Sequence, residues 1–185
     1  MGKIILASSS PRRQNILKET HIKFKVVPSK YEEDHTQTVF SYEFIEKLAY
    51  NKALEVAQRT TEEALVIGAD TVVVLDDEIL GKPKDEEEAV SMLKLLSGRR
   101  HKVVTAIAVI NTKDNTVKKK AVTSYVEFEN LTDEMIKSYV EDYKPLDKAG
   151  SYGIQELPAG FVKNVEGSFK NIIGLCPDAL MELIS

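Results

Sequence analysis

The segment Ala64–Pro83, which reads ALVIGADTVVVLDDEILGKP, constrains the fold more than any other part of the chain. Two apolar runs rich in branched residues, Leu65–Ile67 and Val72–Leu75, predict a buried strand. Between them lies GADT, which places Asp70 inside that strand or at a break in it. Because a buried aspartate loses its hydration, it needs a partner. Two alternatives stay open: a continuous strand that buries the carboxylate, or a strand that ends at Gly68 and leaves Asp70 in an exposed loop.

The residues that follow predict a tight hairpin. The Asp-Asp pair at residues 76–77 suits the turn, and residues 79–80 suit a short returning strand that ends in GKP. A hairpin of this length brings Lys82 back toward Asp70. We therefore expect a carboxylate and an ammonium group at one end of the strand.

The composition shows no excess of positive charge. The 185 residues carry a formal net charge of −4, from 25 basic and 29 acidic side chains. We therefore expect no nucleic-acid partner, and an anionic ligand has to be held by a local basic cluster. The apolar runs are shorter than the roughly 18 residues of a membrane span, so no membrane partner is expected. The single cysteine, Cys176, excludes an intramolecular disulfide and suits a reducing, cytoplasmic location.

The N-terminal segment predicts a strand followed by the start of a helix. Residues 4–7 are apolar, and SSSPRR at residues 8–13 supplies capping hydroxyls, a proline suited to a first helical position and two arginines. A helix N-terminus with hydroxyl and guanidinium groups binds phosphate well. The alternative is a capped helix with Arg12 and Arg13 exposed to solvent.

Residues 24–59 predict a short strand over 24–27, an acidic loop at 31–35 and a long helix. The acidic run is usually a solvated surface. Ser41 caps the helix, whose apolar stripe has the 3.6-residue spacing of a buried face. Lys52 falls within that stripe. Its ammonium either reaches solvent past the apolar residues or points into a cleft.

The second half of the chain predicts alternating helices and strands. Residues 147–155 form a glycine-punctuated loop without periodicity, and long structured loops often carry function. The elements expected here are helices over 85–98 and 132–143 and from Pro177 onward, strands over 103–110 and 117–128, and a hairpin of strands 160–165 and 169–173.

Several motifs of known chemistry are absent from the sequence. It contains no P-loop, no GxGxxG after a strand and no GxSxG. Its histidines, at positions 21, 35 and 101, lack the spacing of metal ligands. The remaining inventory of acidic and basic groups suits phosphate chemistry with a metal ion from solution, where positioning and charge neutralisation do most of the catalysis.

Six segments follow one another along the chain: LASSSPRR at 6–13, the acidic pair at 32–33, GADT at 68–71, GKP at 81–83, LSGRRHKVVTA at 96–106 and LDKAGSYGIQ at 146–155. Together and in this order, they resemble the Maf family of nucleotide pyrophosphatases. The resemblance implies an elongated α/β fold with a mixed sheet and two lobes around a cleft, similar to inosine triphosphate pyrophosphatases. Residues 1–185 would form a single domain without a separate linker. The resemblance also implies hydrolysis of nucleoside triphosphates to monophosphate and pyrophosphate with a divalent cation, Mg²⁺ or Mn²⁺.

Site residues also follow from the resemblance. Asp70 matches the catalytic base of the family, and Asp70 and Glu33 are the acidic groups that would share the cation with the triphosphate. The branch that acts on dTTP and UTP has three residues that match Arg12, Thr71 and Gln155. Where the family has alanine in AGAYGIQ, this chain has Ser151, a small change. The expected catalytic set is Asp70, Glu33, Lys52 and Lys82, and the expected substrate-binding set is Ser8, Arg12, Arg13, Thr71 and Gln155.

Two other functions remain as alternatives. One is a pyrophosphatase for other or modified nucleotides, such as a methylated guanine triphosphate. The other is a nucleotide-binding regulator, in line with the family's association with septum formation, which would need neither Asp70 nor a metal. The oligomeric state stays open, with a homodimer as a candidate.

Overall fold

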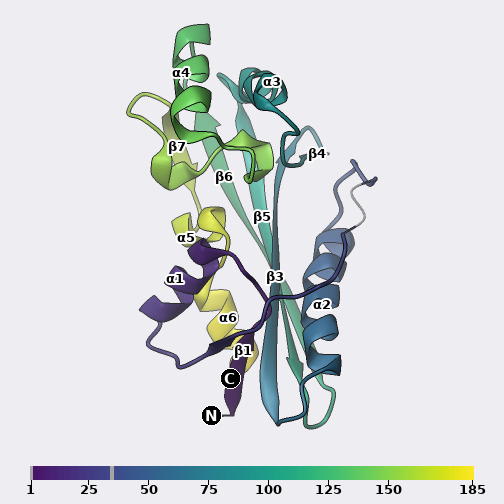
Figure 1. Ribbon diagram of the computed structural model, residues 1–185. Helices are drawn as coiled ribbons and strands as arrows, with labels where there is room; N and C mark the ends of the chain where they lie inside the picture. Colours follow the sequence, from purple (N-terminus) through teal and green to yellow (C-terminus); the bar gives the residue numbers. More distant parts are fainter. Residues whose placement is uncertain (1, 34–35) are drawn as a thin grey trace.

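The computed structural model describes residues 2–33 and 36–185, so part of the predicted acidic loop, residues 34 and 35, lies outside the described residues. The elements form an elongated molecule with an upper and a lower lobe (Figure 1). In chain order they are β1 Lys3–Leu6, α1 Pro11–Glu19, β2 Lys25–Val26, α2 Tyr42–Gln58, β3 Ala64–Leu75, β4 Glu78–Leu80, α3 Glu86–Leu96, β5 Arg100–Asn111, β6 Val117–Phe128, α4 Asp133–Tyr143, the 3-10 helices η1 Ala149–Ser151 and η2 Ile154–Glu156, β7 Val162–Glu166, α5 Phe169–Ile173 and α6 Pro177–Ile184.

Within the described residues, one seven-stranded mixed sheet runs through both lobes. Its strand order is β2-β1-β3-β5-β6-β7, with β4 beside β3. β1 is parallel to β2 and β3, and the other pairs are antiparallel. β3, β5 and β6 have 12 residues each and run the length of the molecule (Figure 1). The predicted fold class, an elongated α/β fold with a mixed sheet and two lobes, is confirmed.

Apolar side chains form three clusters around this sheet. α2 covers one face in the lower lobe, and α1 and α6 cover the other (Figure 1). The apolar stripe predicted for α2 is its buried face, because Ile45, Leu48, Ala49, Ala53 and Val56 all lie in the cluster beneath it. In the upper lobe, α3 and α4 pack against the far ends of the strands.

β3 is continuous through the GADT segment. It pairs with β5 from Leu65 to Val74, and Asp70 is only 7% exposed. The alternative in which the strand ends at Gly68 is therefore wrong, because unbroken pairing with β5 carries the chain through the interruption. The turn predicted at Asp76 and Asp77 is present, and both residues have positive φ, as a tight hairpin requires.

One predicted strand is a helix. Residues 169–173 form α5, and β7 pairs with β6 instead of with this segment. The Ser168 side chain accepts a hydrogen bond from the Asn171 backbone N–H and so caps the helix, and Gly174 ends it with φ of 137°. The apolar run at this position packs as a short helix because these local caps outweigh its strand propensity.

Candidate active site

The site forms where β3 lacks a strand partner on one side. β1 pairs with residues 64–67 of β3, and β4 pairs with residues 73–75 on the same side. Among the described residues, positions 68–72 are paired only with β5, so the GADT segment lies at an open edge between the two lobes. Successive side chains of a strand point to opposite faces, so Asp70 and Thr71 project to opposite sides of the sheet here.

On the α2 face, one ammonium group bridges two carboxylates. Lys52 Nζ lies 2.8 Å from Glu33 Oε1 and also hydrogen-bonds to Asp70 Oδ1. The side chains of Lys52 and Asp70 are only 14% and 10% exposed, and that of Glu33 is 28% exposed. Lys52 therefore does not reach solvent, although it lies within an apolar stripe. Its ammonium points into the site.

A glycine brings α2 close enough for this contact. A Cβ atom at Gly68 would lie 2.2 Å from the Ala49 carbonyl oxygen and 2.7 Å from the Ala53 backbone nitrogen. Since no side chain larger than hydrogen fits, the helix backbone packs directly on β3. Lys52, between these two alanines in sequence, is then held near Asp70, which projects to the same face as Gly68.

On the opposite face, Arg13 of α1 contacts Thr71. Its Nη2 donates to Thr71 Oγ1 at 3.0 Å, its Nε donates to the Gly174 carbonyl at 2.9 Å, and its Nη1 lies 3.5 Å from Ser8 Oγ. The Ser10 side chain caps α1 and Pro11 is its first residue, as the sequence predicts. The predicted anion-binding helix start therefore lies at the open edge of β3.

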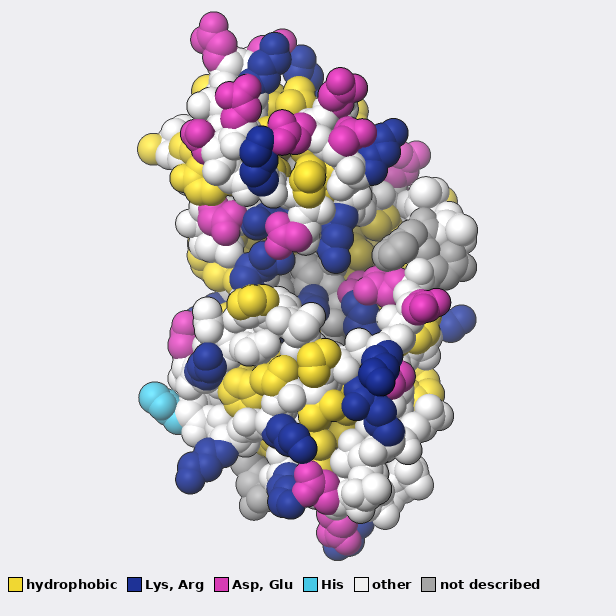
Figure 2. Space-filling view, viewed as in Figure 1, with side chains coloured by type: hydrophobic (Ala, Val, Ile, Leu, Met, Phe, Trp, Pro, Cys, Tyr) yellow, Lys and Arg dark blue, Asp and Glu magenta, His cyan; other side chains and the backbone are white. Residues whose placement is uncertain are grey.

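Charges on one face of the sheet act on charged groups on the other face across that edge. Burial lowers the pKa of the Arg13 guanidinium, while the negative charges of Asp70 and Glu33 oppose the shift and Arg12 adds to it. The arginine is thus close enough to both carboxylates for their charges to act on it. Figure 2 shows basic and acidic side chains together at the waist between the lobes.

Arg12 reaches across to the upper lobe. Its Nη1 lies 3.3 Å from Asp147 Oδ2, and Asp147 Oδ1 accepts from Lys148 at 2.9 Å. Lys148 is buried, and its ammonium also lies 3.3 Å from Glu156 Oε2. Burial by itself would raise the pKa of Asp147, but the bonds to Lys148 and Arg12 outweigh it and the pKa is lowered. A chain of alternating charges thus runs from Arg12 through Asp147 and Lys148 to Glu156. Glu156 directly follows Gln155.

Lys82 follows the end of β4, and its approach to Asp70 through the hairpin stays a prediction. Its side chain is exposed, and it forms no ion pair with Asp70 in the part of the chain that the structure describes. The ammonium that pairs with Asp70 is that of Lys52, because α2 packs directly on β3. The segments of Lys82 and Gln155 are adjacent, since the Gly150 N–H donates to the Gly81 carbonyl at 3.0 Å.

Gln155 lies on η2 at the surface. The buried neighbour Ile154 and a backbone hydrogen bond from Glu156 to Gly153 hold its main chain. Its own side chain is exposed, and within the described ranges no hydrogen bond fixes its amide.

Two carboxylates in this site suit a divalent cation that is shared with a phosphate ligand. Mg²⁺ is commonly bound by one or two protein carboxylates together with substrate phosphates. Residues 2–33 and 36–185 contain no group of three or more His, Cys, Asp or Glu side chains that could hold a metal ion. Asp70 and Glu33, which converge on one ammonium, therefore fit a cation that phosphate oxygens help to bind, and an all-protein metal site is not present among these residues.

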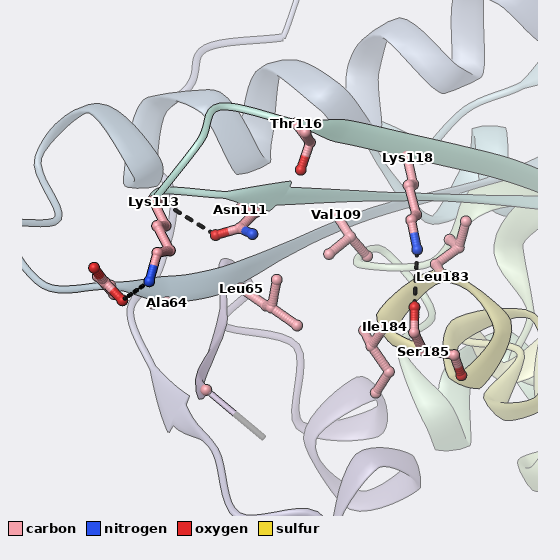
Figure 3. Close-up of a pocket in the computed structure, with 12 residues that line it drawn as sticks. Ala64, Leu65, Val109, Asn111, Lys113, Thr116, Lys118, Leu183, Ile184 and Ser185 are labelled. Carbon is pink, nitrogen blue, oxygen red and sulfur yellow. Dashed lines mark hydrogen bonds and ion pairs between the residues drawn. The ribbon is translucent and has the colours of Figure 1, made fainter.

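A separate cavity lies away from this site. A hollow of about 430 Å³ lies at the lower end of the sheet, between the start of β3, the β5–β6 turn and the end of α6 (Figure 3). Leu65, Val109 and Ile184 form part of its lining, and Lys118 donates to the Ser185 carbonyl at its rim. None of the predicted site residues lines it. The groups suited to phosphate chemistry lie at the open edge of β3 instead.

Sequence reasoning gave no role to four residues that hold the site together. Asp147 and Lys148 lie in the segment LDKAGSYGIQ, but only the fold shows that Asp147 contacts Arg12 and that Lys148 contacts Asp147. Thr105 lies in the segment LSGRRHKVVTA. Its polar side chain within an apolar strand is the one feature of the sequence that could have indicated a role. Asn171 is fully buried in a segment predicted as a strand, and no local sequence pattern indicates its position.

Comparisons with known proteins identify the family of this chain. A model of the family described as Maf-like protein matches residues 3–185. This chain belongs to the Maf-like protein family. The resemblance seen in its six segments is confirmed.

Named relatives of this Maf-like protein cover nearly its whole length. It is 44% identical over 176 residues to a protein of Clostridium botulinum named dTTP/UTP pyrophosphatase, over 94% of this chain and 93% of that protein. A protein of Acetivibrio thermocellus with the same name is 44% identical over 190 residues, over 100% of this chain and 94% of that one. A solved dITP/XTP pyrophosphatase from Mycobacterium abscessus is 15% identical over 98% of this chain and 92% of that chain, with a TM-score of 0.48. Among the described residues, no helix has the length and apolarity needed to cross a membrane.

Proposed function

We propose that this Maf-like protein hydrolyses dTTP and UTP to the nucleoside monophosphate and pyrophosphate, with a divalent cation and with Asp70 as general base. The observation that carries the proposal is the convergence of Asp70, Lys52 and Arg13 at the open edge of β3. The names of relatives that are 44% identical over nearly the whole chain support the substrate class. The single buried cysteine suits a reducing cytoplasm.

The basic groups would bind the triphosphate. Arg13 has further N–H groups besides those that donate to Thr71, Gly174 and Ser8, since a guanidinium carries five. Arg12 lies next to it at the N-terminus of α1, where free backbone N–H groups favour an anion. An incoming phosphate would compete with Asp147 for Arg12. Lys82 is exposed and free to extend toward the same ligand from the opposite lobe.

Asp70 would activate the attacking water. As the water oxygen bonds to the α-phosphorus, the carboxylate accepts its proton, and the bond from that phosphorus to the bridging oxygen breaks to release pyrophosphate. Lys52 holds the Asp70 carboxylate in place, and Glu33 holds Lys52 from the other side. A divalent cation bound by Asp70, Glu33 and the phosphates would neutralise charge that develops on the phosphate oxygens.

Gln155 would select the base. Its amide can meet the imide edge of uracil or thymine, a carbonyl beside N3–H, with two parallel hydrogen bonds. Cytosine presents the reversed pattern, so one amide orientation does not suit both. Unpaired buried polar groups cost about 1–3 kcal/mol each, which corresponds to a preference for UTP over CTP of roughly ten- to several-hundred-fold in kcat/KM. Because the amide is unrestrained in the described structure, the ligand and its surroundings have to fix its orientation.

One experiment tests the reaction and its base together. The wild type, Asp70→Asn and the control Asp77→Asn are assayed against UTP, dTTP, CTP and a methylated guanine triphosphate with Mg²⁺ or Mn²⁺, and products are separated by chromatography. Asp77 is a suitable control because its side chain is 79% exposed in a turn. We expect Asp70→Asn to fold and to lose about 10²–10⁴-fold in activity, and Asp77→Asn to match the wild type.

The outcomes separate the alternatives. Preference for the methylated purine would support a pyrophosphatase for modified nucleotides. Nucleotide binding without pyrophosphate release would support a regulator. Label from ¹⁸O water in orthophosphate, with a diphosphate product, would contradict cleavage between the α- and β-phosphates. Equal hydrolysis of UTP and CTP, with Gln155→Glu unchanged, would remove Gln155 from base selection.

A further inference from the structure

A row of polar side chains crosses three strands beneath Arg13. Thr71 of β3 lies directly opposite Thr105 of β5, and their hydroxyl oxygens are 2.9 Å apart. Thr105 Oγ1 is 2.8 Å from the Asn171 carbonyl oxygen. The Asn171 amide donates to the Val103 carbonyl at 3.2 Å and to Ser124 Oγ at 3.1 Å. Thr105, Ser124 and Asn171 are fully buried, so water does not compete for these bonds.

The donor directions in this row follow from chemistry. Arg13 has only N–H donors, so the Thr71 oxygen accepts at that contact. The Asn171 carbonyl can only accept, so at 2.8 Å Thr105 has to donate to it. The single proton of Thr105 is then used, so the Thr71 hydroxyl supplies the proton between the two threonines. The Gly174 carbonyl, 3.5 Å from Thr71 Oγ1, is the more distant acceptor. Every proton in the row is therefore directed away from Arg13.

Thr105 is linked to the two closer acceptors of Arg13; the third, Ser8 Oγ, is 3.5 Å from Nη1. One acceptor is Thr71 Oγ1, whose lone pair is turned toward the guanidinium because its proton goes to Thr105. The other is the Gly174 carbonyl, at the end of the short helix α5. Thr105 binds the carbonyl of Asn171 within that helix. One buried hydroxyl thus fixes the orientation of the first acceptor and the position of the second.

We propose that Thr105 is a positioning residue for the triphosphate-binding Arg13, and that Thr71 acts through this arginine instead of donating a hydrogen bond to the base. The inference rests on the proposed function in that it takes Arg13 as a phosphate ligand. On this proposal, Thr71 affects substrate binding at the phosphate end of the nucleotide. Its consequence is measurable with a ligand that has no base.

The test uses inorganic tripolyphosphate together with UTP. Thr105→Val keeps the side-chain shape and removes the hydroxyl, Thr105→Ser keeps the hydroxyl, and Thr123→Val is the matched control on the neighbouring strand. Thr123 bonds to Tyr42 at 3.0 Å, and among the described residues no hydrogen bond joins it to Arg13. Dissociation constants for tripolyphosphate come from calorimetry, and KM and kcat for UTP come from pyrophosphate release.

For Thr105→Val, we expect KM for UTP and Kd for tripolyphosphate to rise together by about tenfold or more. Thr105 orients the Arg13–Thr71 hydrogen bond, and the loss of a hydrogen bond to a charged group typically has an effect of that size. kcat should change less. Thr105→Ser should recover most of the loss, and Thr123→Val should match the wild type. In an Arg13→Lys background, Thr105→Val should have less than about a twofold effect, because the two residues act as one unit.

A second variant keeps the proposal open to refutation if Thr105→Val does not fold. Thr71→Val should raise Kd for tripolyphosphate by the same factor as KM for UTP. If Thr71→Val affects UTP but leaves tripolyphosphate binding unchanged, Thr71 reads the base directly and the proposal is wrong. It is also wrong if Thr105→Val leaves both constants within about twofold of the wild type, or lowers only the folded fraction. Failure of the wild type to hydrolyse any nucleotide while it still binds tripolyphosphate would count against the proposed function alone.

Discussion

The substitution Gly68→Ala should damage both stability and activity, because of one close contact between a strand and a helix. The added Cβ atom would lie 2.2 Å from the Ala49 carbonyl oxygen, 2.7 Å from the Ala53 nitrogen and 2.9 Å from Ala53 Cβ. Two of these atoms belong to the backbone of α2, so no side-chain rotation relieves the clash. Ordinary contacts begin at 3.4 Å, so α2 has to retreat by about 1 Å.

Two opposing effects set the change in stability. Forcing an extra methyl group into a packed interface costs about 1–3 kcal/mol. Replacing glycine by alanine also restricts the unfolded chain, which stabilises a protein by about 0.4–1 kcal/mol where the site accepts the methyl group. Here the clash is with backbone, so overpacking outweighs the entropy gain. We expect a net loss of about 1–2 kcal/mol in the free energy of unfolding.

The retreat of α2 also moves Lys52 away from Asp70. A misplacement of about 1 Å in a catalytic group can cost about 10²-fold, and the flexible lysine stem recovers part of this. We expect kcat/KM for UTP to fall by about ten- to a hundredfold, measured by pyrophosphate release under conditions where the variant is fully folded.

Urea unfolding followed by circular dichroism measures the stability change, with Gly81→Ala as the matched control. A Cβ atom at Gly81 would have no atom within 4 Å, so this variant should be unchanged or slightly more stable. The reasoning is refuted if Gly68→Ala unfolds within about 0.5 kcal/mol of the wild type and keeps its activity.

Three further predictions concern charge. Burial lowers the pKa of His101 from 6.5 to about 4. The free energy of unfolding should therefore fall by up to about 3 kcal/mol as the pH drops from about 6.5 toward 4. In urea titrations at different pH values, His101→Gln should lack this dependence. Lys148→Met should destabilise the fold by about 1–2 kcal/mol, because Asp147 and Glu156 lose the ammonium that they share. Thermal unfolding should show that the double variant Lys148→Met/Glu156→Gln recovers part of the lost stability. Excess chelator should abolish pyrophosphate release from UTP, and Mg²⁺ or Mn²⁺ should restore it; full activity in chelator would contradict the proposed cation.

Much of the fold could be predicted from local sequence patterns. The caps of α1, α2, α3 and α4, the turn at Asp76–Asp77 and the long apolar strands are encoded by residues close together in the chain. Periodicity correctly placed the buried face of α2. It failed at residues 169–173, where an apolar run forms a short helix because Ser168 and Gly174 cap it. A run of five residues is too short for its periodicity to separate a helix from a strand.

The sequence by itself determined the chemistry available to this protein: an aspartate within an apolar strand, two arginines at a helix start, and six segments that identify the family. The tertiary structure decided which of these groups meet. Asp70 pairs with Lys52 instead of Lys82, Arg13 crosses to Thr71, and Thr105 supports that contact from the next strand. These pairs are 18, 58 and 34 residues apart in sequence. No local pattern encodes such contacts, because they depend on how closely α2 packs at Gly68 and on the gap in strand pairing that leaves one edge of β3 open.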